Sequence, residues 1–128
     1  MANPSPLDLG KRERQIVEAL YRLEEASVAQ VCQALPEPPS YSTVRAMLNS
    51  LVAKRVVRFR HQGKRYLYRP VAPREKTGRT ALRNLVKNFF AGEPLDAVAA
   101  LLDEHADRLA PNELERIKRI IDEAEKNA

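Results

Sequence analysis

The stretch SYSTVRAMLNSLVAK, residues 40–54, decides how the rest of the chain is interpreted. Its apolar residues recur at the three- and four-residue spacing of an amphipathic helix: Val44, Met47, Leu48, Leu51 and Val52. Ser40 or Ser42 can cap the start of this helix, and we expect it to run to about Lys54. With the apolar stripe turned inward, the outward face carries Ser42, Arg45, Ala46 and Asn49.

Two shorter helices are expected before this stretch. Residues 11–23 carry apolar side chains at helical spacing, and Ser27 can cap a second helix that ends near Leu35, before Pro36, Pro38 and Pro39. After the stretch the period changes. Residues 56–61 and 65–71 are rich in β-branched and aromatic residues, and Gln62-Gly63-Lys64 between them suits a turn, which predicts a β-hairpin.

The order helix, helix, helix, hairpin is that of a winged helix-turn-helix, so we expect a mainly α fold with a DNA-binding domain over residues 1–72. Pro70 and Pro73 mark a boundary, and residues 73–128 are expected to form a helical dimerisation domain. The alternative is that these helices fold back on the winged helix. The side chains expected at the dimer interface are Leu82, Leu85, Phe89, Leu101, Leu102, Leu114, Ile117, Ile120 and Ile121.

Charge is distributed unevenly along the chain. Residues 1–72 hold 12 Lys and Arg against 6 Asp and Glu, whereas residues 73–128 hold 10 against 11. Between Glu37 and Glu75 there is no acidic residue at all, although nine Lys and Arg fall there. An acid-free basic run of this kind is the electrostatic pattern expected of a protein that binds a polyanion, and a merely basic surface is the alternative.

The second helix of a helix-turn-helix pair enters the major groove of DNA. On residues 42–54 the base-reading candidates are Arg45, which can bind guanine, and Asn49, which can bind adenine or simply face solvent. Ser42 and Thr43 can contact bases or phosphates. The side chains of the hairpin that we expect at the DNA backbone are Arg58, Arg60, His61, Lys64 and Arg65. Lys54 and Arg55 are expected to act as favourable charges at the end of the helix.

Several segments together support a family name, namely the run Leu9–Leu23, the Ser27–Leu35 helix, Ser42-Thr43-Val44-Arg45, the hairpin that ends in Tyr66-Leu67-Tyr68, and the helical tail. They resemble the penicillinase-repressor family of bacteria, which includes the β-lactamase and methicillin-resistance repressors. The resemblance covers nearly the whole chain from about Leu9. It implies a homodimer with interlocked tails, contacts of Thr43 and Arg45 with a palindromic operator, and target genes for drug or cell-wall stress responses.

The chain departs from the family pattern at two places. Antibiotic-sensing members are cleaved at an Asn-Phe bond, which aligns here near Ala100–Leu101, while Asn88-Phe89 lies on the preceding helix. The resemblance therefore does not carry proteolytic control over to this chain. The C-terminal cysteine cluster of the copper-responsive branch is also missing, because Cys32 is the only cysteine.

Other classes of function find little support in the residues. His61 and His105 are isolated and the glycines are dispersed, so we expect no metal site, no cofactor and no enzymatic activity. No apolar run is long enough to span a membrane, and a cytoplasmic location is expected. A winged-helix module that binds a protein is the second interpretation. RNA binding is the third and the least favoured, because few aromatic residues are available to stack on unpaired bases.

Overall fold

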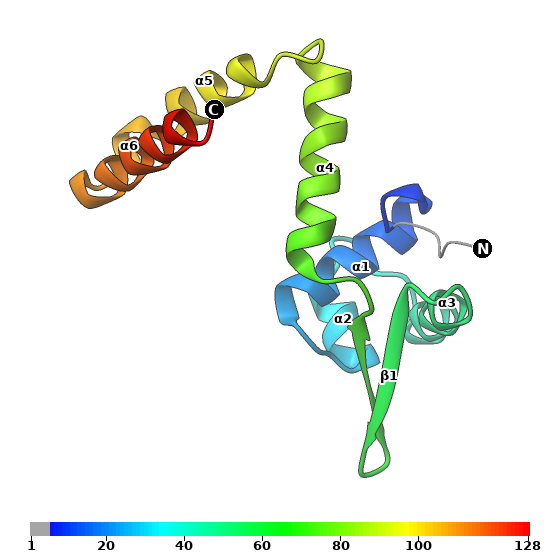
Figure 1. Ribbon diagram of the computed structural model, residues 1–128. Helices are drawn as coiled ribbons and strands as arrows, with labels where there is room; N and C mark the ends of the chain where they lie inside the picture. The colour runs from blue at the N-terminus through cyan, green and yellow to red at the C-terminus, as the bar shows by residue number, and fades with distance from the viewer. Residues whose placement is uncertain (1–5) are drawn as a thin grey trace. The chain divides into compact units, whose positions relative to one another are not determined.

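A computed structural model describes residues 6–128 and divides the chain into two compact units, the first ending at Leu82 and the second spanning Arg83–Ala128 (Figure 1). The elements in chain order are η1 (Pro6–Asp8), α1 (Lys11–Leu23), α2 (Val28–Ala34), α3 (Tyr41–Ala53), β1 (Val57–Gln62), β2 (Arg65–Pro70), α4 (Arg74–Phe89), α5 (Pro94–His105), η2 (Ala106–Arg108) and α6 (Pro111–Lys126). The mainly α fold with three helices followed by a hairpin is confirmed.

The core of the first unit is built from the apolar stripes that the periodicity predicts. Its fully buried side chains come from α1, α2, α3 and β1, and the largest are Ile16, Leu20, Leu48, Leu51, Val17, Val31, Val44 and Val57. Met47 and Val52, also expected to turn inward, are partly buried against this cluster. Because the stripe of α3 is held in the core, the opposite face of that helix is left to solvent.

Helix α2 starts with a complete capping box. The backbone N–H of Gln30 donates to Ser27 Oγ (3.3 Å), and the N–H of Ser27 donates to Gln30 Oε1 (2.8 Å). Helix α3 is capped by Ser40 and not by Ser42, since the N–H of Thr43 donates to Ser40 Oγ (3.2 Å). Both helices therefore begin where a serine satisfies a backbone donor that has no partner inside the helix.

Replacing Ser27 with alanine is expected to lower the free energy of unfolding by about 1 kcal/mol, because a buried helix start loses its cap. Urea unfolding followed by circular dichroism measures the change. Ser50→Ala is the matched control, since Ser50 is exposed inside α3. Equal stability of the two variants would contradict the structural role of the cap.

Strands β1 and β2 pair in antiparallel register, with Phe59 opposite Tyr68 and Gln62 opposite Arg65. The turn is therefore the two residues Gly63-Lys64, and Gln62 belongs to the strand. Gly63 has φ +65°, a conformation that a tight hairpin turn requires and that glycine adopts without strain.

The hairpin is joined to the loop between α1 and α2. Ala26 and Tyr68 exchange two backbone hydrogen bonds, of 3.0 Å from Ala26 N–H and 2.8 Å from Tyr68 N–H. Tyr68 is buried at this point, as a core residue of the wing, whereas Tyr66 is exposed. The bridge fixes the base of the wing to the helical part of the unit.

The first turns of α4 belong to the first unit. The hydroxyl of Tyr21 on α1 lies 2.9 Å from the carbonyl oxygen of Ala72 and 2.8 Å from Thr77 Oγ1, and Arg74 donates to the carbonyl of Tyr21. The compact unit that holds the hairpin therefore extends to Leu82, ten residues beyond residue 72, where the first domain is predicted to end. The division of function at residues 72 and 73 stays a prediction.

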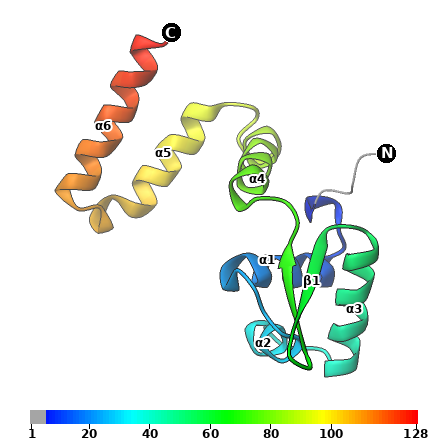
Figure 2. The ribbon, with the colours of Figure 1, turned by 60° about the horizontal axis from the view of Figure 1, so that its bottom comes forward.

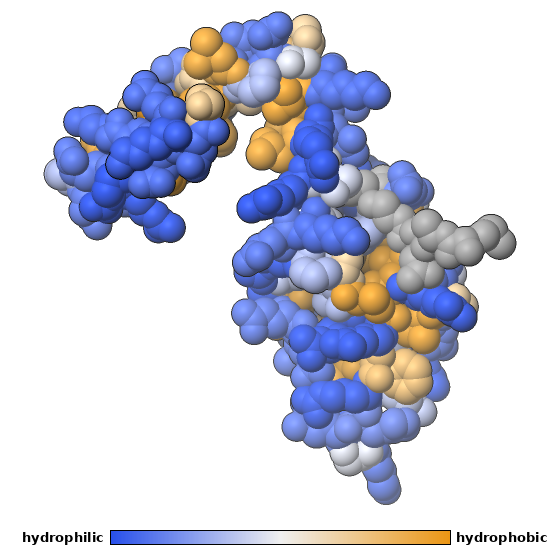
Figure 3. All heavy atoms as spheres, in the orientation of Figure 1, coloured by the Kyte–Doolittle hydropathy of each residue, from blue (hydrophilic) through white to orange (hydrophobic). Residues whose placement is uncertain are grey.

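The second unit has almost no core of its own. Among residues 83–128, all of which the structure describes, Ala97 is the only buried hydrophobic side chain. In Figure 2, α5 and α6 diverge from the η2 turn between them, and apolar side chains of this unit reach the surface in Figure 3. Of the predicted dimer residues in this unit, Leu102 and Ile117 are half-buried, and the exposed ones are Leu85, Phe89, Leu101, Leu114, Ile120 and Ile121. Leu82, the last residue of the first unit, is exposed as well.

Candidate nucleic-acid interface

The exposed face of α3 carries the side chains that the sequence analysis assigns to base reading. These side chains are all exposed: Ser42, Thr43, Arg45 and Asn49. Ala46 lies between them, and its small side chain does not protrude from this face. Figure 2 shows α3 at the side of the first unit with the hairpin next to it. A helix held from beneath by buried residues and open along its outer face has the form required to enter a major groove.

The hydroxyl groups at the start of α3 already hydrogen-bond to one another. Ser40 Oγ lies 2.8 Å from Thr43 Oγ1 and 3.3 Å from Ser42 Oγ. A hydroxyl has one donor and two acceptor positions, so Ser42 and Thr43, which each use one of them here, keep free positions for an outside partner. These hydrogen bonds orient Ser42 and Thr43 at the N-terminal end of α3.

A groove of about 510 Å³ brings the start of α2, the start of α3 and the tip of the hairpin together. It is lined by Ser27, Val28, Ala29, Tyr41, Arg45, Lys64, Arg65, Tyr66 and Tyr68. Three of these side chains are cationic and none is acidic. Burial raises the pKa of the Tyr68 hydroxyl, and the nearby Arg45 guanidinium acts in the opposite direction. The groove is therefore a positively charged hollow between α3 and the wing.

The hairpin separates two kinds of side chain. One face carries a row of aromatic rings, with centroids 4.5 Å apart for His61 and Tyr66, and 5.3 Å apart for Phe59 and Tyr66. Arg58 and Arg60 alternate with Phe59 and His61 along β1, so they lie on the other face. His61 is thus packed against Tyr66, apart from the arginines with which the sequence analysis groups it.

Two basic residues of the acid-free run meet acids from elsewhere in the chain. Arg60 makes two hydrogen bonds, of 2.7 and 2.8 Å, to the carboxylate of Glu25, and these bonds, together with the positive charge of Arg60, lower the pKa of Glu25. Lys54 lies 3.0 Å from Glu13 of α1. The run is free of acids in sequence, but packing places Glu25 beside the wing and Glu13 beside the end of α3.

Unlike Arg60 and Lys54, three other basic residues have no acidic partner in the described part of the chain: Arg45, Lys64 and Arg65. Within residues 6–128 no carboxylate forms an ion pair with any of the three, although Arg65 donates to the side chain of Gln62 (3.2 Å). Lys64 occupies the second position of the turn. The structure therefore brings together three of the predicted DNA-contacting cations in one groove and pairs Arg60 with an acid.

Tyr41 is a candidate that the sequence analysis misses. It is the first residue of α3, its side chain is 57% exposed, and it lines the same groove as Arg45. The spacing of the sequence could have identified Tyr41. Tyr41, Arg45 and Asn49 follow one another at four-residue intervals, so they share one side of the helix.

An exposed, partly basic helix supported by a core and flanked by a basic hairpin defines a winged-helix DNA-binding protein. The family model of the penicillinase repressor matches residues 9–123. The chain therefore belongs to the penicillinase repressor family, as the sequence resemblance implied, and it is a DNA-binding transcriptional regulator. Regulators of this kind are not enzymes.

Solved structures are similar to the chain at low sequence identity. A mutant of MarR from E. coli is 15% identical, with a TM-score of 0.51, over 94% of this chain and 80% of that chain. The BpsR regulator of Bordetella bronchiseptica, whose DNA binding is regulated by 6-hydroxynicotinic acid, is 18% identical, with a TM-score of 0.48, over 93% and 76%. Among curated protein sequences, none matches significantly.

The helices and side chains of the described residues carry no sign of two other kinds of site. Over residues 6–128, no helix combines the length and the apolar character that crossing a bilayer requires. In the same part of the chain, no three His, Cys, Asp or Glu side chains gather in a way that could hold a metal ion. Cys32 is partly buried against the core.

Proposed function

We propose that this regulator is a repressor that binds a two-fold symmetric operator as a homodimer, with Arg45 and Asn49 of α3 reading bases in the major groove. The observation that carries the proposal is the acid-free groove between α3 and the wing, in which Arg45, Lys64 and Arg65 lie together. Arg45 can bind guanine through two hydrogen bonds. Lys64 and Arg65 can form ion pairs with the DNA phosphates that flank the major groove.

The homodimer is supported by the second unit. Its helices expose a series of large apolar side chains, of which Phe89 (78% exposed) is the extreme case. Exposed apolar area of this kind is covered most simply by a second copy of the same surface, because soluble oligomers are predominantly two-fold symmetric. A two-fold dimer presents two copies of α3, which matches an operator of two related half-sites.

The experiment that tests this function starts from random genomic fragments. The full chain is expected to enrich fragments with a common inverted repeat at moderate salt, and to bind them at least about 1,000-fold more tightly than random duplex. Footprinting of the enriched fragments locates the half-sites. Equal affinity for all duplexes would contradict sequence-specific repression and would favour a winged-helix module whose partner is a protein.

The Glu25–Arg60 ion pair gives a prediction about salt dependence. Because Glu25 holds Arg60 with two hydrogen bonds, a DNA phosphate has to compete with that carboxylate. Glu25→Gln is expected to free Arg60 for one additional phosphate contact in each protomer of the dimer. The slope of log K against log salt concentration should therefore steepen by about 2. Fluorescence anisotropy with an enriched duplex over a series of salt concentrations measures the slope.

Glu18→Gln is the matched control, because it removes the same charge from an exposed position of α1, where Glu18 lies 3.8 Å from Arg14. We expect this control to raise affinity slightly and to leave the slope unchanged. Identical slopes for both variants would show that Arg60 does not reach a phosphate when its carboxylate partner is removed.

A further inference from the structure

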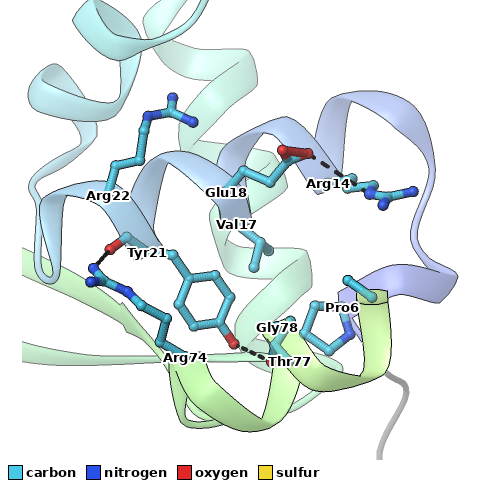
Figure 4. Close-up of a pocket in the computed structure, with 10 residues that line it drawn as sticks. Pro6, Arg14, Val17, Glu18, Tyr21, Arg22, Arg74, Thr77 and Gly78 are labelled. Atoms are coloured by element: carbon cyan, nitrogen blue, oxygen red, sulfur yellow. Dashed lines mark hydrogen bonds and ion pairs between the residues drawn. The ribbon is translucent and has the colours of Figure 1, made fainter. Parts of the chain in front are cut away.

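The first unit contains a second hollow, of about 460 Å³, between α1 and the first turns of α4 (Figure 4). Its inner surface is mostly apolar, formed by Val17 and the ring of Tyr21 on α1, by Gly78 and Ala81 on α4, and by Pro6 of η1. The volume falls within the range of pockets that bind small molecules, which is about 300–1,000 Å³. None of these residues belongs to the groove proposed to contact DNA.

The walls of this hollow are tied together by hydrogen bonds. Tyr21 Oη bonds to Thr77 Oγ1 (2.8 Å) and to the carbonyl oxygen of Ala72 (2.9 Å), and Arg74 donates to the carbonyl of Tyr21. Figure 4 shows the Tyr21 ring held between these contacts, with Val17 beside it. The tyrosine therefore forms a fixed aromatic wall, so the hollow exists before any ligand binds.

Gly78 lines the hollow on the side of α4. A glycine inside a helix is less stable than an alanine there, and tight packing is a common reason for its presence. That reason does not apply here, because a Cβ atom built on Gly78 meets no atom within 4 Å. Gly78 lines the hollow, and a side chain added there would meet open space.

The rim of the hollow is positively charged. Arg14 is paired with Glu18 at 3.8 Å, while Arg22 and Arg74 form no ion pair with a carboxylate within residues 6–128. Arg22 extends away from the hollow in Figure 4, but an exposed arginine changes rotamer readily and can turn toward a bound anion. An apolar interior beneath two unmatched guanidinium groups is complementary to a molecule with an apolar body and one negative charge.

We propose that this hollow binds a small aromatic carboxylate, with its ring against Val17 and Tyr21 and its carboxylate at Arg22 and Arg74. This site is independent of the proposed DNA contacts, and its test reads out direct binding to the full chain.

The probe is 2-naphthoate, followed by ¹H–¹⁵N NMR spectra of the full chain. Glycine amide signals fall in a sparse region, and the chain has only four glycines, one of which lines the hollow. We expect saturable movement of the Gly78 signal, with the signals of Gly63 and Gly92 unmoved. The uncharged 2-naphthamide is expected to bind at least about tenfold more weakly, because it lacks the charge that the rim selects.

Two variants separate the apolar contribution from the charge. Gly78→Leu places a branched side chain at the wall of the hollow, where its Cβ meets no atom within 4 Å, and should abolish binding. The loss of the glycine signal in this variant also assigns the Gly78 peak. Gly78→Ala is the matched control and should still bind 2-naphthoate. Because both variants lack the Gly78 signal, their binding is measured by titration calorimetry. Arg22→Gln should weaken 2-naphthoate about tenfold and leave 2-naphthamide unchanged.

Four results would overturn the proposal. The first is the absence of saturable binding, and the second is equal affinity for the acid and the amide. The third is binding that appears only after residues 2–5 are deleted, which would make the preceding segment of the chain the natural occupant. The fourth is an affinity for 2-naphthoate that falls as the protein concentration rises, which would make the occupant a second copy.

Discussion

Replacing Arg45 with alanine is expected to weaken operator binding at least about 30-fold. A two-hydrogen-bond contact between arginine and guanine contributes about 1–3 kcal/mol of discrimination, and a two-fold dimer loses that contact at both half-sites. The fold should survive, because the Arg45 side chain is exposed and pairs with no carboxylate in the described part of the chain. Fluorescence anisotropy on enriched and random duplexes measures the loss.

Two further variants show whether the loss comes from base reading or from charge. Arg45→Lys keeps the charge and loses the planar, two-pronged geometry, so it should retain affinity for random duplex while the preference for the operator falls. Arg79→Ala removes a positive charge from an exposed site on α4 and should change operator affinity little. Unchanged operator affinity of Arg45→Ala would remove α3 from the proposed role of recognition helix.

The double variant Ile120→Asn/Ile121→Asn is expected to dissociate the dimer. Both side chains are more than half exposed in a single chain, and covering the remainder of an isoleucine contributes about 1 kcal/mol or slightly more. The pair occurs twice in a two-fold dimer, so association should weaken by about 3–6 kcal/mol, which is at least about 100-fold. Sedimentation velocity over a series of concentrations measures this change.

Loss of the dimer should also weaken operator binding, since each monomer then reaches one half-site alone. Asp122→Asn/Glu123→Asn is the matched control. It also introduces two neighbouring asparagines into α6, but at positions that carry charged side chains instead of apolar ones. We expect this control to remain dimeric. A double isoleucine variant that sediments as the parent chain does would place the dimer interface elsewhere.

The helices of the first unit could be predicted closely from the sequence because their signals are local. α1 spans Lys11–Leu23 as the apolar spacing predicts, and Ser27 caps α2 as its position suggests. The change from a helical to an alternating pattern located the hairpin, and Gly63 located its turn. Each of these features depends on residues within a few positions of one another, so periodicity and turn chemistry suffice to identify them.

The three-dimensional partners of the basic residues could not be predicted in this way. Arg60 meets Glu25 from 35 positions away, and Lys54 meets Glu13 from 41 positions away. The bridge between Ala26 and Tyr68 and the separation of His61 from Arg58 and Arg60 likewise depend on how the hairpin packs against the helices. Such contacts come from the closing of long loops, which a short sequence window does not contain.

From the order and period of its residues alone, this chain could be identified as a winged helix with a basic α3 and an apolar helical tail, because side-chain spacing selects secondary structure and burial. Tertiary packing decided which of its cations remain available to a phosphate and which are neutralised by a carboxylate. It also created the hollow beside Gly78, which requires α1 and α4 to lie against each other. Spacing along a chain defines faces, whereas charge pairing and cavities depend on distances between elements.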